Sequence, residues 1–451
     1  MSPIIPFKLK TEKSRRHLAS LVIFFFFVTG ATAQEVYDIG HCIQTGLEYN
    51  FNLRVVRNSE AIATNNYSKG NAGMLPVVTA SSRYGGTLNT TSERYEDGST
   101  DASPYIHNNT GSAAVTMGMT IFRGFEVQTR YRKLGEQVRI EGLRTQMAIE
   151  NLVAAIVAEY NNYLQQMTLY DNMAYAVTLS RERVRIDEQR YLLGSASRMQ
   201  LLQSIVYLNA DSSRYSRQNE VLRASQIRLN ELMATDDPGK AFLLRDDRIT
   251  VDTTLDYDEL LALALENNTS LQIASKNRII SEMDYRIIRS GIYPYLSFTS
   301  GYQYNYNRYG NSDLLRQQTH GLNYGLTLGL DIYDGFNRKR EQNNARIGIE
   351  SSQIRFEEVE QSVKADLLTI YYAYENNLRL MRLEEQNLKV AQENLEIALE
   401  RYKLGSLAGL ELREVQKSLL DAEERLISIK YQIKLAEISL FQLSGGIMNY
   451  L

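Results

Sequence analysis

The chain repeats one long pattern at a fixed distance. The hexapeptide RYLLGS at residues 190–195 returns as RYKLGS at 401–406, which is 211 residues later. At the same distance, VTMGMTIFRGF at 115–125 aligns with LTLGLDIYDGF at 326–336, and no gap is needed between these two landmarks. A period of this length indicates duplication of a large unit rather than a short solenoid repeat. We therefore expect two equivalent halves.

Proline and glycine mark the borders of these halves. Pro76 and Pro294 stand at matching places, and DDPGK at 236–240 separates the two copies. The first copy has seven more residues between Pro76 and Gly118 than its counterpart, and we expect them in a loop. The predicted segments are a signal peptide (1–33), a first repeat (34–237), a linker (238–255), a second repeat (256–445) and a C-terminal tail (446–451).

Alternation with a period of two follows each of the matched prolines. Apolar residues occupy every second position at 296–306, with Ser300 as the one exception, and again at 322–332, with small or polar residues between them. In the first half, 115–121 alternates well, whereas 77–88 does so only roughly. The alternation in each half thus predicts two antiparallel strands that face lipid on one side and water on the other. A soluble hairpin with one face packed on a core is the alternative.

A helical period replaces the alternation after each strand pair. From Phe356 to Tyr402 the apolar positions recur about every 3.5 residues, as in a coiled coil. The proline-free tracts 125–193 and 336–404 predict two helices of roughly 100 Å each. Shorter helices are expected at 39–73 and 197–234. Each half is therefore a helix, two strands, a long helix, a turn at Gly194 or Gly405, and a returning helix.

The amino terminus predicts export from the cytoplasm. Basic residues at 8–16 precede an apolar run at 18–28 and an Ala-x-Ala site before Gln34, which is the layout of a cleaved signal peptide. The single cysteine, Cys42, excludes a disulfide framework. Removal of 1–33 leaves 45 basic and 52 acidic residues, a balance that disfavours nucleic-acid binding. No later apolar stretch is long enough for a helical span.

Four lipid-facing strands per chain do not form a closed sheet. Unpaired strand edges in lipid cost several kcal/mol for each backbone group, and bilayer barrels have at least about eight strands. Three chains supply twelve, whereas an eight-stranded dimer would have an interior filled by side chains. The expected fold class is an α+β membrane protein with internal duplication. In it, four transmembrane strands per chain close a 12-stranded β-barrel as a homotrimer, and the long helices pack as coiled coils.

The order of these elements resembles the TolC family of outer-membrane efflux proteins, also called outer membrane factors. The resemblance covers residues 38–445 and rests on the repeat, on Asn267–Asn268 before Leu271, on IYDGF at 332–336 and on the Tyr-x-x-Gly turns. It implies a trimeric channel in the outer membrane of a Gram-negative bacterium, in contact with lipid, whose long helices form a coiled-coil α-helical barrel in the periplasm. It also implies a periplasmic membrane-fusion adaptor and an inner-membrane RND, ABC or MFS transporter as partners.

The resemblance assigns roles to residues near the two glycine turns. It implies an adaptor contact made by Arg190, Tyr191, Leu193, Gly194, Ser195, Arg401, Tyr402, Leu404, Gly405 and Ser406. It further implies a pore constriction made by Glu411, Glu414 and Tyr402. The alternatives are a plain helix cap at each glycine and two solvated glutamates on a helix surface.

Two positions depart from the family pattern. Leu407 stands where the family's latch has an arginine, and Gln200 stands where that arginine's acidic partner is expected. Arg401 or Arg413 is a candidate replacement for the missing arginine. How the closed pore is held is therefore open at the sequence level.

No enzymatic motif is present in the sequence. The four histidines lack ligand spacing, and neither a zinc-protease, a serine-hydrolase nor a phosphate-loop motif occurs. We predict no enzyme, no cofactor and no metal site. The expected function is the passive exit duct of a tripartite multidrug efflux pump. The alternatives are the outer-membrane duct of a type I protein secretion system and, in another class, a surface coiled-coil adhesin.

Overall fold

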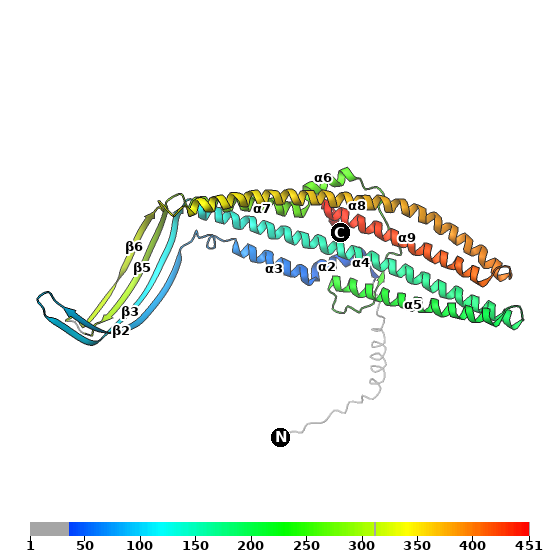
Figure 1. Ribbon diagram of the computed structural model, residues 1–451, viewed down its shortest axis with the longest axis horizontal. Coiled ribbons are helices and arrows are strands. Elements are labelled where there is room, and N and C mark those ends of the chain that lie inside the picture. The colour runs from blue at the N-terminus through cyan, green and yellow to red at the C-terminus, as the bar shows by residue number, and fades with distance from the viewer. Residues whose placement is uncertain (1–35, 311–312, 451) are drawn as a thin grey trace, which may run out of the picture. The chain divides into compact units, whose positions relative to one another are not determined.

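The computed structural model describes residues 36–310 and 313–450, so the predicted signal peptide at 1–33 lies outside the described residues. Both halves show the same order of two helices, two strands and two long helices (Figure 1). The first half contains α2 (Ile39–Tyr49), α3 (Phe51–Asn66), β2 (Val77–Arg94), β3 (Thr100–Arg123), α4 (Glu126–Leu192) and α5 (Arg198–Met233). The second contains α6 (Tyr257–Asn267), α7 (Thr269–Ser290), β5 (Tyr295–Arg308), β6 (Arg316–Gly329), α8 (Asn337–Lys403) and α9 (Gly409–Ser444). Short elements β1 (Val36–Tyr37) and β4 (Leu243–Leu244) pair in parallel, and η1 (Ile447–Tyr450) follows α9.

The two long helices agree with the prediction to within one residue at each end. Both α4 and α8 have 67 residues, which corresponds to roughly 100 Å. Each begins after a Gly-Phe pair with left-handed backbone; φ is 58° and 65° at Gly124 and Phe125, and 68° and 63° at Gly335 and Phe336. A Cβ at Gly124 would lie 2.2 Å from the Ser290 carbonyl oxygen, so that turn requires glycine.

The predicted single helix at 39–73 is wrong, because the chain forms two helices there. The Asn50 side chain accepts the Leu53 N–H at 3.1 Å and caps α3, which ends at Asn66. The same break occurs in the second half, where the Asn268 side chain accepts the Leu271 N–H at 3.1 Å. An asparagine N-cap offers the backbone a local partner that competes with a continuous helix.

The four long strands form one antiparallel sheet in the order β2-β3-β5-β6 (Figure 1). Strand β6 ends at Gly329, before the predicted alternation ends at Ile332. Its apolar side chains are exposed in the single chain, with exposed fractions of 66% to 78% at Leu322, Tyr324, Leu326 and Leu328. The sheet therefore presents an apolar face that this chain does not cover.

The seven extra residues of the first half lie in strands, not in the expected loop. Strands β2 and β3 have 18 and 24 residues, whereas β5 and β6 have 14 each. The register shifts between Asn89 and Thr91, opposite a stretch of β3 that contains Pro104. A bulge tolerates proline within a strand because it interrupts the ladder of hydrogen bonds.

The described residues divide into two compact units. The tip unit consists of 36–45, 159–250 and 387–431, and the sheet unit consists of 46–158, 251–310, 313–386 and 432–450. Within the tip unit, Leu395, Ala398, Tyr402, Leu412 and Leu419 form a buried core cluster. In the described part of the chain, every helix is too short or too polar to cross a lipid bilayer.

Candidate functional site

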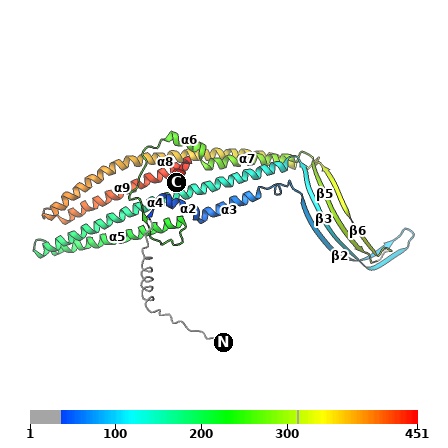
Figure 2. The ribbon, with the colours of Figure 1, turned by 180° about the vertical axis from the view of Figure 1, so that it is seen from behind.

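The two RY-x-LGS copies form the same turn, one between α4 and α5 and the other between α8 and α9 (Figure 2). The Ser195 N–H donates to the Arg190 carbonyl at 2.8 Å, and the Ser406 N–H donates to the Arg401 carbonyl at 2.9 Å. In each turn the serine hydroxyl donates, at 3.1 Å, to the carbonyl that also accepts the N–H of that serine. Gly194 and Gly405 have φ of 73° and 81°. This is the Schellman helix end, which places glycine in the left-handed region.

Both turns expose apolar side chains. Leu193 and Leu404, the residues before the two glycines, have exposed fractions of 82% and 81%. Tyr191 is 41% exposed. Large apolar side chains held at the ends of rigid helices are available for contact with another protein.

Tyr402 links the two helix pairs beneath these turns. Its side chain is 1% exposed, and its hydroxyl donates to the Asp187 carboxylate on α4. The Arg190 guanidinium lies 4.9 Å from the Tyr402 ring centroid and also donates to the Tyr402 carbonyl. Burial and the hydrogen bond to Asp187 raise the pKa of Tyr402. The structure thus brings together Arg190 and Tyr402, two of the residues singled out from the sequence.

A buried ion pair provides a second link. The Arg413 Nη1 and Nη2 atoms on α9 donate to the two carboxylate oxygens of Asp211 on α5 at 2.7 and 2.8 Å. The two side chains are 11% and 2% exposed. The Ser180 hydroxyl on α4 donates to the same carboxylate at 2.5 Å. We call Tyr402–Asp187 and Arg413–Asp211 together the clasp.

The two candidate replacements for the missing latch arginine behave differently. Arg401 Nη2 donates to the Ser406 carbonyl at 3.4 Å, within its own turn. Arg413, in contrast, joins α9 to α5. Leu407, at the family's arginine position, packs half-buried against the core cluster, and the Gln200 N–H is capped by the Ser197 hydroxyl at 3.2 Å.

The predicted constriction residues do not form one cluster within the chain. Glu411 and Glu414 are exposed near the beginning of α9, whereas Tyr402 is buried. No interaction between either glutamate and the clasp joins these groups among the described residues. Their assignment to a constriction remains a prediction.

Three buried polar residues of this region, Arg183, Asp187 and Asp211, were not predicted from the sequence. The signal was a row of polar residues on one face of α4, spaced three or four apart as Ser180, Arg183, Asp187 and Arg190. Ser180, Arg183 and Asp187 are all buried. Polar residues on a seam that is otherwise apolar indicate a buried network.

The described residues contain no candidate metal-binding cluster. Across 36–310 and 313–450, no three His, Cys, Asp or Glu side chains are placed to hold a metal ion. The site instead offers two exposed apolar turns above a buried polar link.

Comparison with known proteins agrees with the resemblance predicted from the sequence. Residues 260–446 match the family described as outer membrane efflux protein. The chain is 24% identical to the outer membrane protein TolC of Vibrio cholerae over 198 residues, which are 43% of this chain and 44% of that protein. It is 26% identical to the probable efflux pump outer membrane protein TtgC of Pseudomonas putida over 170 residues, 36% of this chain and 34% of the other. The chain thus spans less than half the length of these curated relatives.

Solved structures match nearly the whole chain. The Campylobacter jejuni CmeC outer membrane channel superimposes with a TM-score of 0.73 at 16% identity, over 90% of this chain and 85% of the other. The outer membrane protein VceC of Vibrio cholerae gives 0.71 at 14% identity, over 90% and 96%. At such low identity these likenesses show the fold alone, and this fold agrees with the predicted mixture of long helices and long antiparallel strands.

Proposed function

Because residues 260–446 match the outer membrane efflux protein family, we propose that this chain forms the outer-membrane exit duct of a tripartite efflux pump. The duct passively conducts small molecules to the exterior of a Gram-negative cell, and it catalyses no reaction. One observation carries the proposal. The four-stranded sheet has an exposed apolar face and two outer strands, β2 and β6, that each pair on one side only within the described chain.

The function therefore requires more than one copy of the chain. Open sheet edges do not occur in the hydrocarbon region, so β2 of one chain pairs with β6 of a neighbour. Three copies give twelve strands. The same number of copies brings six helix turns together, which form the surface for a periplasmic adaptor and, through it, an inner-membrane transporter.

Engineered disulfides between β2 and β6 test this closure. Within one chain, three inter-strand distances separate β2 from β6, which is about 14 Å and too far for a disulfide bond. Thr79→Cys combined in turn with cysteine at each position from 318 to 328 should give a covalent trimer ladder in a non-reducing gel. The native thiol does not interfere, because Cys42 is fully buried and burial raises its pKa to about 12.

The matched control places the two cysteines on neighbouring strands, where they can bond to each other within one chain. Thr79 and Thr116 are paired across β2 and β3, with hydroxyl oxygens 2.8 Å apart. Thr79→Cys with Thr116→Cys should therefore form a disulfide without any ladder. If no β2–β6 combination yields a trimer in outer membranes, closure between chains is wrong. Release of the protein by carbonate washing would favour the adhesin alternative instead.

A further inference from the structure

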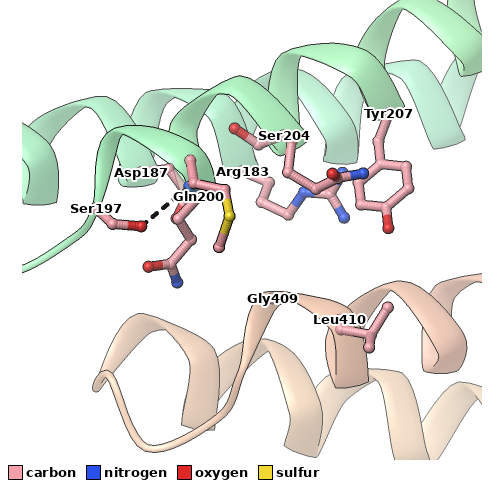
Figure 3. A pocket seen from close by; sticks show the side chains of 10 residues that line it. Arg183, Asp187, Ser197, Gln200, Ser204, Tyr207, Gly409 and Leu410 are labelled. Carbon is pink, nitrogen blue, oxygen red and sulfur yellow. Dashed lines mark hydrogen bonds between the residues drawn. The ribbon is translucent and has the colours of Figure 1, made fainter.

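The tip unit contains a cavity beside the clasp. It has a volume of about 370 Å³ and is bounded by α4, α5 and the beginning of α9 (Figure 3). Figure 3 shows Arg183 and Tyr207 on the wall formed by α4 and α5, with Gly409 and Leu410 of α9 opposite them. All of these residues belong to one compact unit of a single chain.

Arg183 is a buried cation, and two of its three nitrogen atoms lack hydrogen-bond partners among the described residues. Its side chain lines the cavity although the residue is only 2% exposed. Nη1 has one long contact, 3.5 Å to Gln416 Oε1, and neither Nε nor Nη2 has a hydrogen-bond partner among the described residues. The guanidinium stacks 4.7 Å from the Tyr207 ring centroid, which fixes its plane. A buried donor without an acceptor is unfavourable, and more so when it belongs to a charged group.

The neighbouring acids are already engaged. The Asp187 carboxylate accepts the Tyr402 hydroxyl, and the Asp211 carboxylate accepts both Arg413 donors and the Ser180 hydroxyl. Desolvation and the nearby Arg413 charge lower the pKa of Arg183. The charges of Asp187 and Asp211 oppose this shift only in part, and the Arg183 Nε and Nη2 atoms remain without acceptors among the described residues.

Two helix ends add positive potential at the same place. Helix α5 begins at Arg198 behind the N-cap Ser197, and helix α9 begins at Gly409; each has 36 residues. Ser197 and Gly409 both line the cavity. The amino end of a helix carries about half a positive charge and presents free N–H groups, which favours anions.

We propose that this cavity binds one small anion, with a carboxylate as its chemical class. The Nε and Nη2 edge of an arginine matches the two oxygens of a carboxylate in a bidentate pair. The carboxylate comes either from a free organic acid or from a Glu or Asp side chain on a helix docked between the two turns. The second source rests on the proposed adaptor contact, whereas the first does not.

A single tryptophan beside the cavity makes the binding measurable. The chain has no tryptophan, and Met199 lines the cavity with 78% of its surface exposed. In purified, detergent-solubilised Met199→Trp protein, iodide quenching should saturate, because iodide occupies the anion site. Sodium acetate at constant ionic strength should displace iodide, while quenching by neutral acrylamide should stay unchanged.

Variants of Arg183 distinguish iodide binding in this cavity from a non-specific attraction of iodide to positive charge. Arg183→Gln should weaken iodide quenching at least tenfold and leave acrylamide quenching unaltered, which also reports that the fold is kept. Arg183→Lys keeps the positive charge but loses the bidentate guanidinium group. Its iodide quenching should be weaker than with Arg183 and stronger than with Arg183→Gln. Arg185→Gln, on the same helix but 60% exposed, is the matched control and should change nothing.

The source of the carboxylate follows from competition. A helical peptide with one Glu that displaces iodide better than its Gln counterpart indicates a docked side chain, and equal peptides with effective acetate indicate a free acid. Iodide quenching that Arg183→Gln leaves intact, or that neither acetate nor the Glu peptide reverses, overturns the site. None of these outcomes depends on conduction, so the duct is tested separately by the β2–β6 disulfides.

Discussion

At the scale of single residues, the Asp211–Arg413 pair differs from the surface pair Glu182–Arg185 on α4 because it is withdrawn from water. Its side chains are 2% and 11% exposed, against 44% and 60% for the surface pair. Removing one partner of a buried pair leaves an uncompensated charge and is strongly destabilising. An exposed pair is screened by solvent and contributes little.

Asp211→Asn should therefore lower the unfolding free energy of the purified chain by about 3–5 kcal/mol. The measurement is urea unfolding followed by far-ultraviolet circular dichroism. Asp211→Asn with Arg413→Gln should lose less than the sum of the two single changes, because they remove the same interaction. Glu182→Gln is the control and should lose less than about 1 kcal/mol. Additive losses at positions 211 and 413 would contradict the link.

Tyr374 on α8 gives a second prediction, for alkaline conditions. Its hydroxyl donates to the Asp252 carbonyl at 2.8 Å, and burial raises its pKa to about 12. The unfolded chain releases this proton near pH 10. Between pH 10 and 12 the folded chain therefore holds more protons than the unfolded chain, and stability falls as the pH rises. Below pH 10 the contribution is fully present.

The melting temperature of Tyr374→Phe should accordingly depend less steeply on pH between 10 and 12 than that of the unchanged chain. At pH 8 the variant should be less stable by about 1 kcal/mol, because it lacks the hydrogen bond. Tyr372→Phe serves as the control, since Tyr372 lies on the same helix with 62% of its surface exposed. Parallel curves for the two variants across this range would refute the assignment.

At the scale of elements, glycines at the chain reversals fall into two kinds. Gly194 has φ of 73°, and a Cβ added there would meet open space, so only the backbone conformation resists substitution. Gly124 combines φ of 58° with a Cβ position 2.2 Å from the Ser290 carbonyl oxygen. The first turn needs glycine for conformation, and the second needs it for space as well.

Gly194→Ala should thus destabilise the chain by about 1–2 kcal/mol, the strain of a left-handed residue. Gly124→Ala should do clearly more, because the Ser290 backbone must also move. Gly348→Ala is the matched control, since it replaces a glycine inside α8 with open space around it. It should stabilise the helix slightly. Melting temperatures of the three variants rank them, and equal losses at 194 and 124 would remove the steric argument.

How far the sequence predicts these elements depends on whether the signal is local. The ends of α4 and α8 were predictable because Gly-Phe precedes, and Leu-Gly-Ser follows, a proline-free heptad pattern in each half. The break at Asn50 was missed because an asparagine cap is a weak signal inside an amphipathic tract. The extension of β2 and β3 was missed because Ser, Thr, Asn and Pro104 there are typical of loops. Pairing with a neighbouring strand outweighs that local preference.

The candidate site was predictable only in part, for a related physical reason. Both turns follow from glycine at a helix end, which is local. The clasp joins α4 to α8 and α5 to α9, so Asp187 and Asp211 acquire their partners only through tertiary packing. Without a structure, each is one acidic residue among many on a long helix.

At the scale of the whole molecule, the single chain leaves large apolar side chains exposed at the sheet and at the turns. The apolar residues of β6 and the two leucines of the turns remain exposed in it. Glu411 and Glu414 are likewise exposed on α9. If three chains close a ring, each level of the ring carries three copies of each carboxylate, and their combined field selects cations.

Ion selectivity of the assembled ring is therefore the last prediction. In planar bilayers, the trimer should prefer potassium over chloride and should be blocked by trivalent metal ions, because the carboxylates attract them at close range. Glu411→Gln with Glu414→Gln should reduce the cation preference several-fold and weaken the block. Glu424→Gln, a change further along α9, is the control and should have a smaller effect. If the double variant keeps both the preference and the block, the two glutamates are solvated helix residues and the constriction lies elsewhere.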